Sequence, residues 1–155
     1  MKKLNQFIIE KFRLSKDNLN KQQRDLSNTD ISKVKQLMRF KTPREENMNW
    51  VKMEQYFNKK SNPQRLVNSI KDDRKLVFRW YICVINGYSD YYPTFREAIV
   101  ERDICTEDQL DAYILFKYNS AYAGSAYGGN STYAKGIRER LEEYLDTYDV
   151  KYDKK

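Results

Sequence analysis

Two pairs of glutamates have a spacing that could support acid–base chemistry. Glu97 and Glu101 lie four residues apart on one expected helix, and Glu139 and Glu143 repeat that spacing on another. General acid–base catalysis needs a carboxylate that is desolvated and whose pKa is therefore raised. Each pair instead has an arginine within helical reach, so we expect solvated ion pairs and no enzymatic activity. These arginines are Arg96, Arg102, Arg138 and Arg140.

The cysteine and histidine content argues against a metal site and against a thiol nucleophile. The chain contains two cysteines, Cys83 and Cys105, and no histidine. Structural zinc sites use four cysteine or histidine ligands, and a catalytic cysteine usually has a histidine as its base. Both cysteines stand among apolar residues, where a free thiol behaves as a small hydrophobic side chain. The sequence therefore predicts two buried, reduced thiols, no metal ion and no cofactor.

A glycine-rich segment at residues 124–130 (GSAYGGN) could bind an anion. It precedes an expected helix, and backbone N–H groups at the start of a helix can bind phosphate. Gly128, Gly129 and Lys135 form this candidate anion site, although the segment lacks the Lys-Ser or Lys-Thr pair of a nucleotide P-loop. The alternative is a plain hinge between two helices. An enzyme site of unfamiliar type, if one were present, would also lie in this tyrosine- and glycine-rich region.

Positive charge is concentrated in the N-terminal third of the chain. Residues 1–44 contain 12 lysines and arginines against 4 acidic residues, whereas residues 45–155 contain 17 against 18. Basic residues in the stretch 33–44 could neutralise phosphates and give salt-sensitive affinity for DNA or RNA. The alternatives are a solubilising face, or a face that pairs with acidic residues of the body. The candidate nucleic-acid contacts are Lys33, Lys35, Arg39, Lys41 and Arg44.

Tyrosine is unusually frequent, with 13 residues among 155. A tyrosine ring can fill a core, form a protein interface while its hydroxyl stays hydrated, or stack on an unpaired base. The sequence leaves these three interpretations open. The two clusters are Tyr88, Tyr91 and Tyr92, and then Tyr113, Tyr118, Tyr122, Tyr127 and Tyr133.

Apolar residues at helical spacing, together with helix start signals, predict an all-α fold. Thr42 and Thr106 each begin a capping-box pattern, and Asn62-Pro63 combines a cap with proline at the first helical position. The apolar run 76–85 could also form a strand, but its spacing and length favour a helix. The expected helices cover residues 3–14, 29–41 and 43–58, a short helix after Pro63, one from Asp72 or Asp73 to near Gly87, one after Pro93, one from Thr106 to about Ala123, and a last helix after Ser131 or Thr132.

These elements predict a single compact bundle of about six to seven helices with a basic N-terminal helical extension. Residues 1–28 would form an amphipathic helix and a polar linker, residues 29–150 the helical domain, and residues 151–155 a loose tail. No run of 18 apolar residues is present, and the start of the chain lacks the apolar core of a signal peptide. We therefore expect a protein that is neither secreted nor inserted in a membrane.

The first twelve residues, MKKLNQFIIEKF, resemble a known class of targeting segment. Met1-Lys2, Phe7-Ile8 and Glu10 match the pattern of the capsid-targeting sequences of phage internal head proteins. The stretch from Leu4 to Asp17 is also similar to the N-termini of proteins from crAss-like phages. The resemblance implies a phage accessory protein, associated with the virion or injected into the host cytoplasm, with inhibition of host defences as one such role.

The N-terminal helix also has the physical character of a docking segment. Phe7, Ile8, Phe12 and Leu14 recur at helical spacing and could enter a groove on a protein partner, which would be a capsid, portal or host protein. The alternative is that this helix packs onto the body of the protein as part of its core. A different function, that of a cytoplasmic nucleic-acid-binding regulator, would use a helix-turn-helix-like pair at residues 29–58.

Overall fold

The computed structural model describes residues 28–39, 42–58, 62–122 and 132–154, and the regular structure within these ranges is entirely helical. The predicted all-α fold is confirmed, and the strand alternative for residues 76–85 is wrong because this run lies inside α5. The predicted docking residues Phe7, Ile8, Phe12 and Leu14 lie outside the described residues. The first described helix covers residues 28–37. It is followed by α3 (Pro43–Asn58), α4 (Pro63–Ser69), α5 (Asp73–Asn86), α6 (Tyr92–Glu101), α7 (Glu107–Tyr122) and α8 (Thr132–Thr147).

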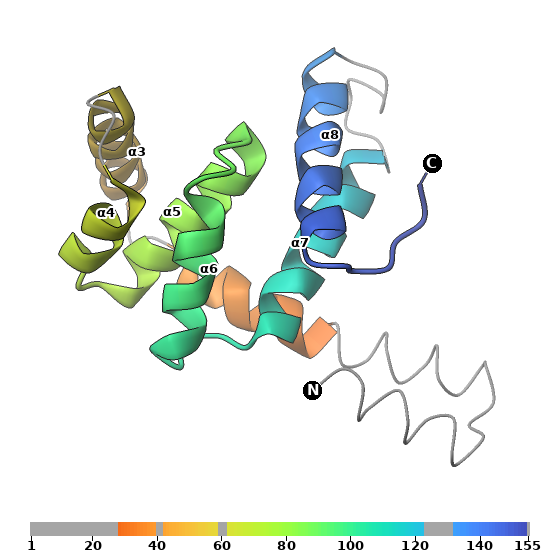
Figure 1. Cartoon of the computed structure of the whole chain (residues 1–155), viewed down its shortest axis with the longest axis horizontal. Coiled ribbons are helices and arrows are strands. Elements are labelled where there is room, and N and C mark those ends of the chain that lie inside the picture. Colours follow the sequence, from red (N-terminus) through yellow and green to blue (C-terminus); the bar gives the residue numbers. More distant parts are fainter. Residues whose placement is uncertain (1–27, 40–41, 59–61, 123–131, 155) are drawn as a thin grey trace.

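Helix α5 is the centre of the bundle and packs against both α6 and α8. Figure 1 shows α3 and α4 on one side of α5 and α6, and α7 and α8 on the other. Leu76, Val77, Trp80 and Val84 of α5 are fully buried, because the apolar residues cover most of its circumference. The helix ends at Gly87, whose φ of +73° is strained for any residue with a side chain.

The predicted start signals form the hydrogen bonds that their residue types imply. The Asn62 side chain accepts a hydrogen bond from the Gln64 N–H at 2.8 Å. The Thr106 hydroxyl accepts from the Gln109 N–H at 3.2 Å, and the Gln109 carboxamide oxygen accepts from the Thr106 N–H at 2.9 Å. This reciprocal pair is a capping box, so the helix starts were predictable from local sequence.

The helix expected at residues 29–41 is shorter, since it ends at residue 37. Thr42 caps α3 through its hydroxyl, which accepts a hydrogen bond from the Glu45 N–H at 3.2 Å, and Pro43 is the first residue of α3. Proline disfavours helical geometry at the residue that precedes it, so the first helix has to end before Thr42. Arg39 therefore lies in the connection between the two helices.

Arginines bind the C-terminal carbonyls of neighbouring helices. Arg102, just after α6, donates to the carbonyl of Ile70 at 2.7 Å and to that of Val67 at 3.1 Å, at the end of α4. Arg74 of α5 donates to the carbonyl of Leu37, the last residue of the 28–37 helix, at 3.3 Å. These carbonyls lie at helix C-termini and carry partial negative charge, so a guanidinium stabilises them even at Val67, whose carbonyl also accepts from the Ile70 N–H.

Helix α8 uses two arginines in the same way. Arg138 is only 8% exposed and donates to the carbonyl of Ala121 near the end of α7 at 3.4 Å. Arg140 donates to the carbonyl of Ile85 near the end of α5. The prediction of solvated ion pairs is therefore wrong for Arg102 and Arg140, whose hydrogen bonds go to backbone carbonyls of other helices.

The C-terminal residues 151–154 pack against the bundle, where the sequence predicted a loose tail. The Tyr152 ring meets the Tyr118 ring edge-on, with centroids 5.1 Å apart. The Tyr118 hydroxyl donates to the carbonyl of Asp153 at 3.2 Å, and the Tyr152 hydroxyl donates to Asp146 at 3.0 Å. The tail thus links α7 to α8 through two tyrosines.

Candidate functional site

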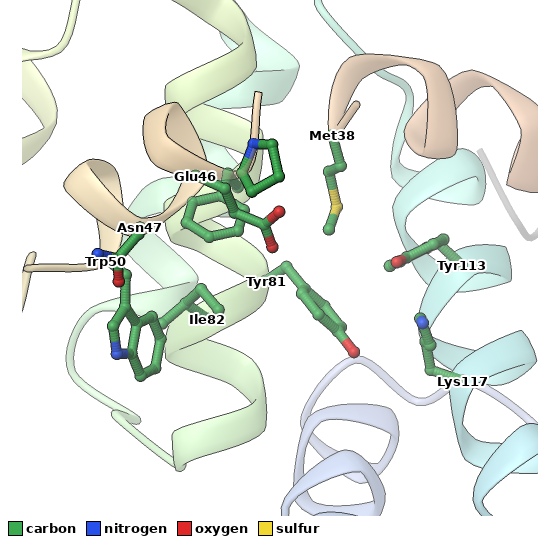
Figure 2. A pocket seen from close by; sticks show the side chains of 10 residues that line it. Met38, Glu46, Asn47, Trp50, Tyr81, Ile82, Tyr113 and Lys117 are labelled. Atoms are coloured by element: carbon green, nitrogen blue, oxygen red, sulfur yellow. The ribbon is translucent and has the colours of Figure 1, made fainter. Parts of the chain in front are cut away.

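A pocket of about 430 Å³ lies between α3 and α7, with α5 as its floor. In Figure 2, Trp50 and its α3 neighbours form one wall, Tyr113 and Lys117 of α7 form the other, and Met38 borders the pocket from the end of the first described helix. The pocket is lined by Met38, Pro43, Glu46, Asn47, Trp50, Phe78, Tyr81, Ile82, Tyr113 and Lys117.

Helix α3 contacts the rest of the bundle through aromatic side chains at two points along its length. Trp50 packs against a small apolar cluster that consists of Met53, Phe78 and Ile82. Further along α3, the Phe57 ring stacks on the Tyr88 ring at 4.6 Å between centroids. The Trp50 wall is therefore part of an apolar cluster that joins α3 to α5.

The α7 side of the pocket combines aromatic rings with positive charge. The Tyr81 and Tyr113 rings meet edge-on at 5.3 Å, and the Lys117 ammonium lies 5.8 Å and 5.6 Å from their respective centroids. The Lys35 ammonium lies 4.2 Å from the centroid of the Phe116 ring, next to Lys117 in the sequence. Burial first, and then the nearby charge of Lys35, lowers the pKa of Lys117. Among the described residues, neither lysine forms an ion pair with a carboxylate.

The tyrosines of the pocket are neutral hydrogen-bonding groups. Burial, followed by the proximity of Tyr133, raises the pKa of Tyr81 to about 12. Burial also raises the pKa of Tyr113, with Tyr81 as the second cause. Neither phenol is poised to act as a base near neutral pH.

Three of the predicted nucleic-acid contacts lie close to this pocket. Arg39 and Arg44 adjoin its lining residues Met38 and Pro43, and Lys35 lies near Lys117, whereas Lys33 lies near Cys105. Lys33, Lys35, Arg39 and Arg44 are all exposed, while Lys41 lies outside the described residues. Within the described ranges these four form no ion pair with a carboxylate, so the alternative in which they pair with the acidic body is not what the structure has there. We call Lys33, Lys35, Arg39 and Arg44 the basic rim.

Sequence reasoning found the basic rim but missed the pocket beside it. Trp50, Tyr81 and Lys117 come from three helices, and no local pattern connects them. The two tyrosine clusters were the signal in the sequence that pointed to this region. They did not show whether the rings fill the core, form an interface or stack on bases. Three of those tyrosines are buried in the core, namely Tyr92, Tyr113 and Tyr118, and Tyr88 and Tyr91 pack against it.

The candidate anion site at the glycine-rich segment is placed only in part. Lys135 is exposed on the first turn of α8, and Gly128 and Gly129 lie outside the described residues. Tyr133, next to Lys135, is 76% exposed and is the most exposed large side chain among the described apolar residues. This site remains an expectation from the sequence.

The two thiols are buried and free, as predicted. Burial raises the pKa of Cys105 to about 11, and it raises the pKa of Cys83 further. Nearby positive charge from Lys33 and Arg79 opposes these shifts without overcoming them. No group of three or more metal-ligating side chains occurs in the part of the chain that the structure describes.

A second cluster of ionisable groups is buried between α6, α7 and α8. Arg96 is 4% exposed and forms an ion pair with Asp111, which is 6% exposed. Arg96 also donates to the Tyr144 hydroxyl, and its guanidinium carbon lies 3.8 Å from the centroid of the Tyr148 ring. The prediction of a solvated ion pair is wrong for Arg96 as well, because α7 and α8 enclose it.

The charges in this cluster stabilise the ionised form of Arg96. Burial by itself lowers the pKa of a guanidinium, but the hydrogen bond and charge of Asp111 outweigh it, and the net effect raises the pKa of Arg96. Burial raises the pKa of Tyr148 to about 12 despite the neighbouring Arg96. The cluster therefore consists of a permanent ion pair and neutral phenols, which is a structural arrangement.

Two further observations concern membrane insertion and similarity to known proteins. Within the described ranges, no helix is both long enough and apolar enough to cross a lipid bilayer. Comparison with known proteins gave no match of this chain to a protein-family model, to a curated protein or to a solved structure.

Proposed function

We propose that this protein is a non-enzymatic nucleic-acid-binding protein whose basic rim contacts phosphates. The observation that carries the proposal is the set of four exposed cations, three of them close to a pocket, without carboxylate partners among the described residues. Lysine and arginine side chains that neutralise phosphates release counterions, which gives affinity for any sequence and a steep dependence on salt. The planar guanidinium groups of Arg39 and Arg44 could in addition bind phosphate oxygens in pairs.

The test is a variant in which the four residues of the basic rim are changed to glutamine. We expect affinity for a short labelled DNA strand to fall roughly 100-fold at about 50 mM salt, and the slope of log K against log salt to fall by about 3. Fluorescence anisotropy across a salt series measures both quantities. All four side chains are exposed, so the helical content should not change.

A matched control removes the same amount of charge elsewhere. Arg65, Lys71, Lys151 and Lys154 are also exposed, and changing them to glutamine gives the same net charge as the rim variant. If the proposal is right, this control retains most of the affinity. Equal losses in the two variants would mean that only net charge matters, and no binding by the unaltered protein at low salt would remove the proposal.

The resemblance of the N-terminus supports a more specific setting, in which this is a phage accessory protein. In that setting Phe7, Ile8, Phe12 and Leu14 dock on a capsid, portal or host protein, and the basic rim contacts DNA in the virion or in the host cytoplasm. Deletion of residues 1–14 should then remove the protein from purified particles while the circular dichroism of the body stays unchanged. Packaging of the truncated chain at the normal level would contradict this setting.

A further inference from the structure

We infer that the pocket between α3, α5 and α7 binds one unpaired base of a nucleic-acid strand, and that Lys117 and Lys35 hold the adjoining phosphate. This inference rests on the proposed function and adds to it a preference for single strands. Its volume of about 430 Å³ lies in the range of roughly 300–1,000 Å³ that is usual for pockets that enclose small ligands.

The rings of the pocket supply the surface on which a base would stack. Trp50 and Tyr81 are both half-buried, so each keeps part of its ring accessible while its backbone is fixed in a helix. Stacking on aromatic side chains binds bases of any sequence, since every base has an aromatic face. Ile82 and Phe78 lie between the two walls and exclude water from the floor of the pocket.

The polar groups of the pocket give the bound nucleotide a direction. Figure 2 places Glu46 and Asn47 on the α3 side and Lys117 on the α7 side. The carboxylate of Glu46 repels phosphate but can accept a hydrogen bond from a base N–H, such as the N3–H of thymine, and Asn47 can both donate and accept. The base edge therefore faces α3, and the phosphate faces Lys117.

The two lysines need an anion that the described residues do not supply. Lys117 is half-buried against Tyr81 and Tyr113, and Lys35 is close enough to lower its pKa. A phosphate between the two ammonium groups would relieve their repulsion and offset the desolvation of Lys117. The basic rim continues this charge along the strand, through Arg39 and Arg44.

A paired base cannot use this site. In a duplex, each base is stacked between its neighbours and its Watson–Crick edge is occupied, so a recessed pocket can accept only a base that is already unpaired. A helix-turn-helix pair would have the opposite preference, because it reads base edges in the major groove of a duplex. Strand preference thus separates the two modes of binding.

The experiment compares three labelled ligands of equal length at one salt concentration: oligothymidylate, the same backbone with abasic sites, and a duplex. We expect oligothymidylate to bind about tenfold more tightly than the abasic strand, and the fluorescence of Trp50 to be quenched on binding. Trp50→Ala should abolish this advantage, so that this variant binds oligothymidylate and the abasic strand equally. Met48→Ala is the control, since Met48 is also on α3 but is 47% exposed and does not line the pocket.

A second variant blocks the pocket without removing a packed side chain. Asn47 is exposed at the pocket wall, so Asn47→Trp should fill the pocket and also abolish the advantage of oligothymidylate. Equal affinity for the abasic strand and oligothymidylate would overturn the base pocket and leave the proposed function intact. Tighter binding of the duplex than of either strand would overturn it in favour of groove binding, and an absence of binding to all three would remove the proposed function itself.

Discussion

Arg96→Met is expected to lower the free energy of unfolding by about 3–5 kcal/mol, because it leaves the carboxylate of Asp111 buried without its cation. Asp111 is 6% exposed, and its closest charge partner is the guanidinium of Arg96. The Tyr144 hydroxyl, 3.4 Å from Asp111, is neutral and does not replace the positive charge of the guanidinium. Since domains of this kind are stable by about 5–15 kcal/mol, a loss of this size should be visible as a large shift in the midpoint of urea unfolding.

The control for Arg96→Met removes both charges together. The double variant Arg96→Met with Asp111→Leu replaces the ion pair by apolar side chains, and such replacements are often neutral or stabilising. We therefore expect the double variant to be more stable than Arg96→Met alone. A loss below about 1 kcal/mol in the single variant would indicate that water reaches the pair, as at an exposed salt bridge.

Trp80→Ala is the second substitution with a large expected effect, a loss of about 3–5 kcal/mol in the free energy of unfolding. Trp80 has no exposed surface, and its ring lies 5.9 Å from that of Tyr144 in an edge-on arrangement. Truncation to alanine removes these contacts and leaves a cavity in the centre of α5, where the surrounding helices can relax only partly. Thermal or urea unfolding followed by circular dichroism measures the loss.

Trp80→Phe tests whether packing is the cause. The indole Nε1 of Trp80 is buried and has no hydrogen-bond partner among the described residues, so phenylalanine keeps most of the apolar contacts and breaks no hydrogen bond. This variant should lose clearly less stability than Trp80→Ala. An equal loss in the two variants would show that the indole ring has a role that its apolar contacts do not explain.

The helix starts could be predicted from the sequence because their causes are local. Asn62, Asp72 and Thr106 cap their helices through side chains only two or three residues away from the N–H groups that they bind. The spacing of the apolar residues in the run 76–85 likewise predicted a helix there, which is α5. These features depend on neighbours along the chain, which a sequence displays directly.

The arginines and the pocket could not be predicted in the same way. Arg96, Arg102 and Arg140 have acidic residues within helical reach, yet their hydrogen bonds go to groups 15 to 55 residues away. The pocket likewise joins Trp50 to Lys117 across three helices. Contacts of this range depend on how helices cross, which the periodicity of a single helix does not determine.

The arginines at the helix ends and the lysines at the proposed binding surface differ in their chemical reactivity. The arginines at the helix ends hold the bundle together, whereas Lys33 and Lys35 are exposed at the proposed binding surface and Lys117 lies in the pocket. An acylating reagent reacts with lysine amines and leaves guanidinium groups intact, while an α-dicarbonyl reagent attacks arginine. Acylation should therefore weaken the affinity for polyanions to the share that Arg39 and Arg44 supply, in a protein that is still folded, whereas modification of the arginines at the helix ends should unfold it.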